Sequence, residues 1–489
     1  MNLSIIVYLL GNVLKIEGLL MLLPALVGAL YREPQALSYL FCALITMVIG
    51  LVISLKKPDN QVFYAREGLV SVGLSWLVLS LFGCIPFILS GDIPHFVDAF
   101  FEIISGFTTT GSSILKDVEA ISHTSLFWRS LSHWIGGMGV LVFILSVLPM
   151  TGGAALHLMR AESPGPQVGK IVPKMRDSAF ILYLIYTIMT ILEIVILLIG
   201  KMPAFDAVTL SLGSAGTGGF SVRNSGLADY SAFSQYVIAT FILLFGVNFN
   251  VYFLVLRRQY KQALKCEEMR WYFLIVFSAV AIITLNIIPM FSSVEQAFRH
   301  SYFQVASIIT TTGYATTDFN FFPELSREIL LLLMFIGACA GSTGGGIKVS
   351  RIVIGLKSVK NELSRIIHPR SVKQIRFEGK PLEGSTINSV HIFIITYVVL
   401  SVVSLLAVSL DNFDTTTNFS AVAATLNNIG PGLNRVGPYG NFSEFSDFSK
   451  LVFCFDMLAG RLEIFPILVL ANPNTWRKPF IRKKRAQTV

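Results

Sequence analysis

Charged residues are scarce in this chain. Only 14% of its 489 residues are Asp, Glu, Lys or Arg, whereas a soluble globular domain carries about 25%. This shortage excludes a soluble enzyme, a disordered regulator and a nucleic-acid-binding domain. Hydrophobic residues instead make up 53% of the chain, and the mean hydropathy is +0.67. The composition therefore predicts a protein embedded in a lipid bilayer.

Paired cysteines and clustered histidines are also missing from the sequence. The five cysteines form no CxxC pair, so neither a disulfide framework nor a metal cluster is indicated. The seven histidines are scattered along the chain and form no HExxH motif. A membrane-embedded enzyme needs a constellation of such groups within its spans. We therefore expect no enzymatic activity and assign no catalytic residue.

Apolar runs of about 20 residues, the length that spans a bilayer, recur along the whole chain. The first, Leu3 to Leu30, is too long for the core of a signal peptide and is interpreted as a retained helix. Nine further spans are expected at residues 36–55, 68–90, 128–149, 177–200, 233–256, 271–291, 328–353, 390–410 and 449–471. The fold class is therefore an all-α polytopic membrane protein with ten spans.

Lysine and arginine are distributed unevenly between alternate connecting stretches. Five stretches together hold 26 of the 38 basic residues, whereas the four that alternate with them hold 6. Because cytoplasmic loops retain basic residues, the first set is cytoplasmic and both termini lie inside. The net charge of +9 is mostly this topology signal, and it also favours contact with anionic membrane lipid. No nucleic-acid partner is expected, because no binding motif accompanies the dispersed charges.

Each of the four outward stretches contains an apolar segment too short to span, followed by a turn rich in small polar residues. The segments read DAFFEIISGFTTTGSSIL (98–115), AFDAVTLSLGSAGTGGFSV (204–222), SYFQVASIITTTGYATTDF (301–319) and NFSAVAATLNNIGPGL (418–433). They align on four glycines, Gly111, Gly219, Gly313 and Gly430, at spacings of 108, 94 and 117 residues. This recurrence indicates a fourfold internal repeat of span, half-helix, glycine turn and span. The two helices before residue 56 stand outside it.

Irregular backbone at membrane depth is tolerated only where it is buried in protein or lines a water-filled path. Four such turns around one axis form a ring of carbonyl and hydroxyl oxygens, which can replace the hydration shell of an alkali cation. Glycine permits the positive φ that turns a carbonyl toward the axis. The half-helices end near these turns, so their negative dipole ends also favour a cation.

Other interpretations of these segments compete with a cation pore. Four ordinary surface turns would explain each segment singly, but not their recurrence on one side of the membrane after a short apolar segment. A proton- or sodium-coupled carrier for an organic solute would also use broken helices at the midplane. Carriers of that kind are built from two halves, however, and not from four copies.

The eighth span is interrupted by GSTGGG, residues 341–346, and four glycines in six residues do not sustain a helix in a membrane. A broken helix at this depth normally lines a substrate path. A Walker A phosphate loop does not fit, because Ile347 stands where the motif requires lysine. A glycine-rich packing face between helices remains the structural alternative.

Arg461 lies near the middle of the last span, where a charge costs about 3 kcal/mol or more. One interpretation places its side chain in the pore beneath the ring of four turns. There it would bond the glycine-rich loop, and its positive charge would oppose the passage of cations. The other is a buried ion pair with Asp456, Glu463 or an acid on another helix. Both can hold. Lys348, at the inner end of the loop, is interpreted as a residue that reaches the membrane interface.

The chain resembles the Trk/Ktr/HKT superfamily of potassium transporters, and most closely its bacterial TrkH/TrkG type. The resemblance covers nearly the whole chain, including the two N-terminal helices. Its most specific motifs are SGFTTTGSS (105–113), SHWIGGMGV (132–140), ITTTGYATTDF (309–319), GACAGSTGGGIKVSR (337–351), NNIGPGL (427–433) and DMLAGRLEIFPILVL (456–470). The second filter, GTGGFS, matches less closely, and Gly218 is an alternative to Gly219 as its filter glycine.

The resemblance implies a single-subunit pore with one selectivity-filter glycine per repeat. Members with glycine in all four repeats select K⁺ over Na⁺, and this chain keeps the glycine of the first repeat, Gly111. The implied filter residues are Thr109, Thr110, Gly111, Thr217, Gly218, Gly219, Thr311, Thr312, Gly313, Asn428, Ile429 and Gly430. Among these, the residues expected to contact K⁺, which is the transported ion, are Thr110, Gly111, Gly218, Gly219, Thr312, Gly313, Ile429 and Gly430. The implied intramembrane gate comprises Gly341, Ser342, Thr343, Gly344, Gly345, Gly346 and Arg461.

The resemblance also implies partners and a location. A homodimer in the bacterial inner membrane is expected, with both termini cytoplasmic and a TrkA-type nucleotide-binding subunit docked on the basic cytoplasmic surface, notably residues 351–380. No cofactor is expected in this chain, so ATP, ADP or NAD(H) would act only through that partner subunit.

The expected organisation has five units: two N-terminal helices at 1–60, pore repeats at 61–160, 161–265 and 266–380, and a fourth repeat with a basic tail at 381–489. The sequence leaves open whether K⁺ passes as in a channel or whether the same fold is a proton- or sodium-coupled cation symporter.

Overall fold

The computed structural model describes residues 1–58, 64–139, 175–370 and 373–476. These residues are mostly helical, as the apolar runs of spanning length predict. The one sheet in this part of the chain is a short antiparallel hairpin of β1 (Arg376–Phe377) and β2 (Lys380–Pro381). The all-α fold class is therefore confirmed.

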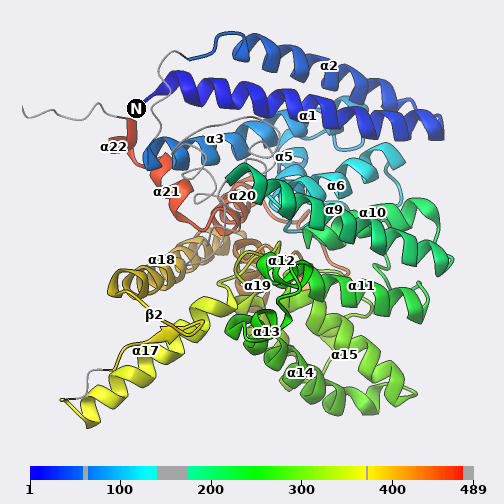
Figure 1. The fold of residues 1–489 in the computed structure, drawn as a ribbon. Helices are drawn as coiled ribbons and strands as arrows, with labels where there is room; N and C mark the ends of the chain where they lie inside the picture. Colours follow the sequence, from blue (N-terminus) through cyan, green and yellow to red (C-terminus); the bar gives the residue numbers. More distant parts are fainter. Residues whose placement is uncertain (59–63, 140–174, 371–372, 477–489) are drawn as a thin grey trace, which may run out of the picture.

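Two N-terminal helices, α1 (Leu3–Tyr31) and α2 (Gln35–Ser54), lie side by side along one edge of the molecule (Figure 1). The next group of elements belongs to the first predicted repeat. It contains α3 (Ala65–Gly83), α4 (Ile85–Ser90), α5 (Phe96–Phe107) and α6 (His123–Gly137).

The second group contains α9 (Met175–Ile199), α10 (Ala204–Gly216), α11 (Ala232–Phe245), α12 (Phe249–Leu256) and α13 (Tyr260–Leu264). The third contains α14 (Glu267–Ile287), η1 (Ile288–Met290), α15 (Val294–Ile309), η2 (Phe319–Phe321), α16 (Glu324–Ile336) and α17 (Val349–Ile367). The fourth contains α18 (Gly384–Val408), η3 (Ser409–Asp411), α19 (Thr415–Leu426), η4 (Asn434–Val436), α20 (Asp447–Arg461), α21 (Phe465–Ala471) and α22 (Pro473–Trp476).

The predicted spans are realised in two ways. Six helices in the described part of the chain are long and apolar enough to cross a bilayer, and α11 with α12 makes a seventh across a 91° bend. The other three predicted spans correspond to α6, to α16 with α17, and to α20 with α21. The later part of the span predicted at 128–149 lies outside the described residues. The spans at 233–256 and 449–471 are thus broken, which the sequence interpretation did not anticipate.

Local chemistry explains these two unexpected breaks. The first falls between Phe245 and Phe249, where Asn248 caps α12 by accepting a bond from the Asn250 backbone. The second follows Arg461, where Glu463 and Ile464 adopt positive φ and Pro466 opens α21. Proline is favoured in the first turn of a helix and cannot continue a preceding one.

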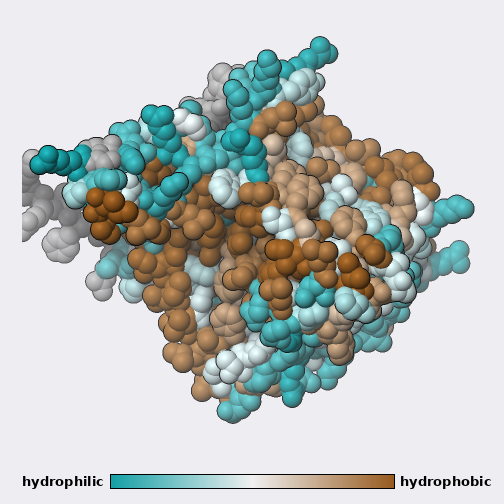
Figure 2. Space-filling view, turned by 90° about the horizontal axis from the view of Figure 1, so that it is seen from below, coloured by the Kyte–Doolittle hydropathy of each residue, from teal (hydrophilic) through white to brown (hydrophobic). Residues whose placement is uncertain are grey.

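Apolar side chains remain exposed around the long helices. Leu44 and Val48 on α2, Phe277 on α14 and Val399 on α18 are each about half exposed or more. Figure 2 shows hydrophobic residues across much of one face, with hydrophilic residues toward its edges. A surface this apolar is solvated by lipid and not by water.

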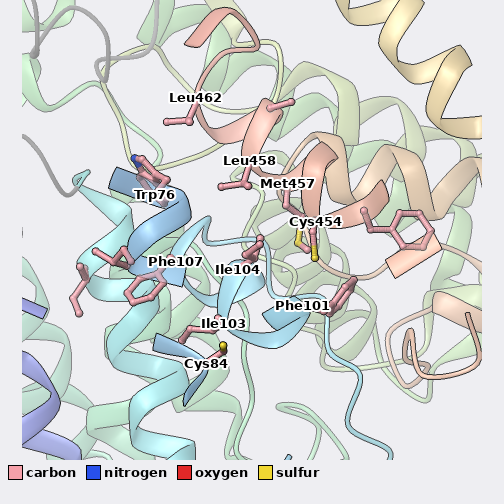
Figure 3. Packing of buried hydrophobic residues seen from close by; sticks show 14 of the residues in the cluster. Trp76, Cys84, Phe101, Ile103, Ile104, Phe107, Cys454, Met457, Leu458 and Leu462 are labelled. Carbon is pink, nitrogen blue, oxygen red and sulfur yellow. The ribbon is translucent and has the colours of Figure 1, made fainter. Parts of the chain in front are cut away.

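The short helices α5, α10, α15 and α19 occupy the interior. On α5, for example, Phe101, Ile103, Ile104 and Phe107 are all fully buried. Figure 3 shows this helix packed between α3 and α20. The residues of each half-helix nearest its turn are the ones buried, from Phe101 to Phe107 on α5 and from Phe303 to Ile309 on α15, so these helices insert their C-terminal ends into the bundle.

The two ends of the described chain lie near each other. The Met1 amino group is 4.0 Å from the Glu67 carboxylate, and the neighbouring Arg66 donates to the Asn474 carbonyl at 3.2 Å. Figure 1 shows the N-terminus beside α22. Both ends therefore lie on the same side of the molecule.

Close packing of α1 on α2 generates a stability prediction. A Cβ added at Gly18 would lie 2.7 Å from the Ala43 carbonyl oxygen, so Gly18→Ala must separate the helices. We expect a loss of about 1–3 kcal/mol, measured as a lower Tm of the detergent-solubilised protein. Gly355→Ala on α17 is the matched control, because no atom lies within 4 Å of its added Cβ. That variant should be unchanged or gain about 0.5–1 kcal/mol, and an equal Tm for both variants would contradict the packing argument.

Candidate functional site

The four interior half-helices end in the same hydrogen-bonded turn. In each, a backbone N–H reaches back five residues: Thr110 to Ser105, Gly218 to Gly213, Thr312 to Ser307 and Ile429 to Ala424, all at 2.8–2.9 Å. The residue before each donor bonds three residues back. This pair of bonds is the Schellman ending, which requires one left-handed residue at the turn.

The left-handed residue is threonine or asparagine in all four turns. Thr109, Thr217, Thr311 and Asn428 have φ of 56°, 55°, 59° and 57°. Two residues later φ is positive again, at 80°, 80°, 84° and 102° for Gly111, Gly219, Gly313 and Gly430. Sequence reasoning expected positive φ only at the glycines. A β-branched residue in this conformation is strained, so composition alone gave no signal for it.

The structure also resolves the alignment of the second turn. Gly219, not Gly218, has the φ and the position of the other three filter glycines. Gly218 instead occupies the place of Thr110, Thr312 and Ile429, the residue immediately before the glycine.

These four turns close into a ring. A Cβ added at Gly111 would lie 2.0 Å from the Gly218 carbonyl oxygen. A Cβ added at Gly219 would lie 1.9 Å from the Thr312 carbonyl oxygen, and one added at Gly313 would lie 1.9 Å from the Ile429 carbonyl oxygen. At Gly430 the distance to the Thr110 carbonyl oxygen would be 2.8 Å. Each glycine is thus packed against a carbonyl of the next repeat, in the order one, two, three, four and back to one. Carbonyl oxygens from four segments far apart in sequence meet around one axis.

Side chains connect the ring further. Asn428 donates its amide to Thr110 Oγ1 at 2.9 Å, and Ser112 donates to the Gly430 carbonyl at 3.0 Å. Both bonds join the fourth turn to the first. Thr110 and Thr312 each exchange a hydroxyl bond of 2.8 Å with the threonine two residues earlier. The hydroxyls of these residues are therefore engaged within the turns.

All four filter glycines line one wall of a cavity of about 140 Å³ on the outer side of the ring. Lys116, Arg223 and Tyr439 are among its other lining residues. Nearby, Asn224 donates its amide to Asp117 at 2.7 Å, and this hydrogen bond lowers the pKa of the Asp117 carboxyl below its usual value. The mouth of the ring therefore carries charged groups of both signs.

A glycine-rich segment lies against the other side of the ring. Residues 337–348 leave α16 and enter α17 without helical structure, as the run of glycines predicts. Gly345 donates its N–H to Thr311 Oγ1 at 2.6 Å, and Gly346 donates to the Asn427 carbonyl at 3.1 Å. Gly341, Ser342, Thr343 and Gly344 complete the predicted gate segment, which is thus bonded directly beneath the third and fourth turns.

The ends of this segment are held by a residue that sequence reasoning missed. Glu268, buried at the start of α14, accepts the Ala340 N–H at 2.7 Å and the Ser350 N–H at 3.1 Å. An acid in the first turn of a span is common as a helix cap, so nothing in the sequence set it apart.

Lys348 was expected at the membrane interface, and that expectation is wrong. Its side chain is 2% exposed, and its ammonium group donates to the Gly344 carbonyl. Carbonyls released by the broken helix supply the acceptor that a buried ammonium needs. Lys348 also has φ of 84°, which continues the irregular backbone.

Arg461 contacts the gate segment as one of the two interpretations predicted. Its guanidinium donates to the Thr343 carbonyl at 2.8 Å and to the carbonyls of Gly136 and Gly137 at 2.5 and 2.6 Å. Asp456 and Glu463, the two acids named as possible partners, are engaged elsewhere. Glu463 pairs with Arg351 at 2.6 Å, and Asp456 accepts the Ser404 hydroxyl at 2.6 Å.

Three breaks in the spans meet beneath the ring. Cys339 donates to the Gly246 carbonyl at 3.1 Å and Phe249 to the Gly341 carbonyl at 3.0 Å, so the gate segment lies in the bend between α11 and α12. Arg461 brings the end of α20 to the same place. A cavity of about 80 Å³ lies there, and it is lined by glycines of the gate segment together with Lys348, Arg461 and Glu463. Cavities therefore lie on both sides of the ring, and the gate segment stands between the ring and the inner one.

Comparison with known proteins agrees with this architecture. Residues 36–478 match the TrkH family, described as a cation transport protein. The chain is 35% identical over 466 residues to the Trk system potassium uptake protein TrkH of Escherichia coli K12, covering 94% of this chain and 96% of that protein. It is 31% identical over 488 residues to the Trk system potassium uptake protein TrkG of the same organism, covering 97% and 99%.

A solved structure is similar over the same extent. The crystal structure of the potassium transporter TrkH from Vibrio parahaemolyticus matches with a TM-score of 0.87 and 32% identity, covering 98% of this chain and all of that one. Sequence, fold and ring geometry thus agree, and the chain belongs to the TrkH family of cation transport proteins.

Proposed function

We propose that this protein takes up potassium ions across the bacterial inner membrane through the ring of four turns. The observation that best supports this proposal is that each filter glycine packs on a carbonyl of the next repeat, which closes the four turns into a ring. Carbonyl rings replace the water around an alkali cation, and four half-helices direct their negative ends toward the same place. The relatives are named as potassium uptake proteins. The residues proposed to contact K⁺ are Thr110, Gly111, Gly218, Gly219, Thr312, Gly313, Ile429 and Gly430.

The segment 341–346 is proposed to be the gate. It is bonded to Thr311 and Asn427 on the inner side of the ring, so an ion leaving the filter must displace it. Because Arg461 bonds the segment and also lines the inner cavity, its charge opposes cations there. Displacement of the segment is what a regulatory signal must accomplish.

Regulation is proposed to come from the cytoplasmic side, where both termini are placed by the distribution of basic residues. Helix α17 continues directly from the gate segment and projects beyond the body of the molecule (Figure 1). It carries Lys357, Lys360 and Arg365. A TrkA-type subunit docked there would act on the gate through one continuous helix, with adenine nucleotide or NAD(H) bound to that subunit. A homodimer in contact with membrane lipid completes the proposed assembly.

Gly313→Ser tests the filter. With φ of 84° and the Ile429 carbonyl 1.9 Å from the added Cβ, serine must displace one ring carbonyl. We expect the K⁺/Na⁺ flux ratio in proteoliposomes to fall by about tenfold, the effect of about 1.4 kcal/mol of lost discrimination. Uptake of K⁺ should need no imposed pH or Na⁺ gradient. Uptake that vanishes without such a gradient would instead identify a coupled symporter of the same fold.

The matched control for this variant is Gly91→Ser. Gly91 has φ of 81°, so serine suffers the same backbone strain, but no atom lies within 4 Å of its added Cβ and it lies outside the ring. Its flux ratio should equal that of the unaltered protein. Equal ratios in both variants would show that the ring does not select the ion.

Arg461 gives the test of the gate. A unit charge about 8 Å from a cation contributes about 2 kcal/mol at an effective dielectric constant of about 20. Arg461→Ala should therefore raise the K⁺ flux of the protein alone by about tenfold or more. Arg461→Lys keeps the charge but not the forked bonds to Thr343, Gly136 and Gly137, so a flux near the unaltered value assigns the effect to charge. If Arg461→Ala lowers the Tm and leaves the flux unchanged, the residue is structural only.

A further inference from the structure

Helix α6 carries two buried polar residues one turn apart, Arg129 and His133, which are 1% and 0% exposed. They are the seventh and eleventh residues after the cap residue Ser122. Counting in the same way from Ser231, Pro323 and Ser446 gives the corresponding residues of the other three repeats. These are Ile238, Leu330 and Phe453 at the first position and Ile242, Met334 and Met457 at the second, all buried.

Arg129 joins the first filter turn to the second. Its Nε donates to Glu102 Oε1 at 2.8 Å, and its Nη2 donates to Ser113 Oγ at 3.3 Å. Its Nη1 donates to the Ser221 carbonyl at 3.4 Å, and the guanidinium lies 4.0 Å from the centre of the Phe220 ring. Ser113 lies two residues after Gly111, and Ser221 lies two residues after Gly219. One side chain therefore holds equivalent points of neighbouring repeats.

Glu102 completes this link from the half-helix α5. Besides the ion pair, it accepts the Ser113 hydroxyl and the Ile114 N–H, both at 2.9 Å. It stands nine residues before Gly111, and the corresponding residues in the other repeats are Leu210, Gln304 and Ala421. An acidic side chain at this position thus occurs in the first repeat and not in the other three.

His133 lies directly behind the second turn. Its Nδ1 donates to the Gly106 carbonyl at 2.8 Å, and its Nε2 accepts the Phe220 N–H at 3.3 Å. These two bonds fix the neutral tautomer with its proton on Nδ1. A Cβ added at Gly218 would lie 2.2 Å from the imidazole ring. The residue whose carbonyl joins the ring is therefore backed by a side chain that is bonded to the first repeat.

Stability does not account for this charged link. A buried ion pair pays a desolvation cost that its attraction only partly returns, and well-packed apolar residues are often equally stable. The other three repeats use apolar residues at the positions of Arg129 and His133. The charged pair adds hydrogen bonds to both filter turns, which an apolar pair cannot make.

We propose that Glu102 and Arg129, supported by His133, are positioning residues that fix the first and second filter turns relative to each other and so set the K⁺/Na⁺ discrimination of the ring. This inference rests on the proposed function of the ring. It assigns part of the selectivity to side chains that do not touch the ion.

The test converts the first repeat to the chemistry of the second. The double variant Glu102→Leu/Arg129→Ile copies Leu210 and Ile238, and removing both charges together leaves no unpaired buried charge. We expect the variant to fold and to retain K⁺ uptake into proteoliposomes, with a Tm close to that of the unaltered protein, because the desolvation cost removed with the ion pair offsets the acceptor that Ser113 and Ile114 lose. The K⁺/Na⁺ flux ratio should fall by about tenfold, equivalent to about 1.4 kcal/mol.

Two further variants separate positioning from general stability. Arg129→Lys keeps the charge but cannot bond Glu102, Ser113 and Ser221 together. Its K⁺/Na⁺ flux ratio should therefore lie between that of the unaltered protein and that of the double variant. The control removes the ion pair at the other end of α5, where Lys450 donates to Asp98 at 2.6 Å. Asp98→Asn/Lys450→Met should leave the ratio unchanged.

The outcomes distinguish this inference from the function on which it rests. If the unaltered protein shows no K⁺ preference, the proposed function itself fails. If Gly313→Ser loses the preference while Glu102→Leu/Arg129→Ile keeps it, the filter stands and the positioning role is overturned. Should the double variant not fold, Arg129→Lys decides, because an unchanged ratio there also overturns the role.

Discussion

The hydrogen-bonded ending of the four half-helices is the constraint on which the rest of the structure depends. A backbone that leaves a helix inside a membrane must pair its polar groups within the protein. Each half-helix does this by sending an N–H back five residues, and the turn that results forces the next carbonyl away from the helix. Four copies of this geometry bring four carbonyls together. The surrounding spans, the outer loops and the gate segment all pack on that arrangement.

Electrostatics beneath the ring follow from the same principle. Broken helices expose carbonyls, and buried cations use them: Lys348 bonds Gly344, and Arg461 bonds Thr343 and the last carbonyls of α6. Each charge thereby gains acceptors within the protein, while the carbonyls gain donors. The gate segment is consequently held by reciprocal satisfaction of polar groups and not by apolar packing alone.

Much of this organisation could be predicted from the sequence because it follows from patterns that recur along the chain. The apolar runs gave the spans, the recurrence of glycine gave the four turns, and GSTGGG gave the break between α16 and α17. The breaks after Phe245 and Arg461 were missed, although Asn248 and Pro466 are residues that begin helices. The burial of Lys348 and the roles of Glu268 and Arg129 could not be predicted, since each depends on which distant backbone groups lie opposite. The positive φ of Thr109, Thr217 and Thr311 could not be predicted either, because threonine rarely adopts this conformation.

The cyclic contact of the filter glycines has a consequence for how such a protein changes over time. In a ring built from four identical chains, any substitution appears four times at once. Here the four quarters are encoded separately, so one quarter can vary while three are retained. The first repeat already differs from the others in the chemistry behind its turn. A single-chain ring can therefore be adjusted one quarter at a time, so that any property of the proposed filter becomes graded and open to change by single substitutions.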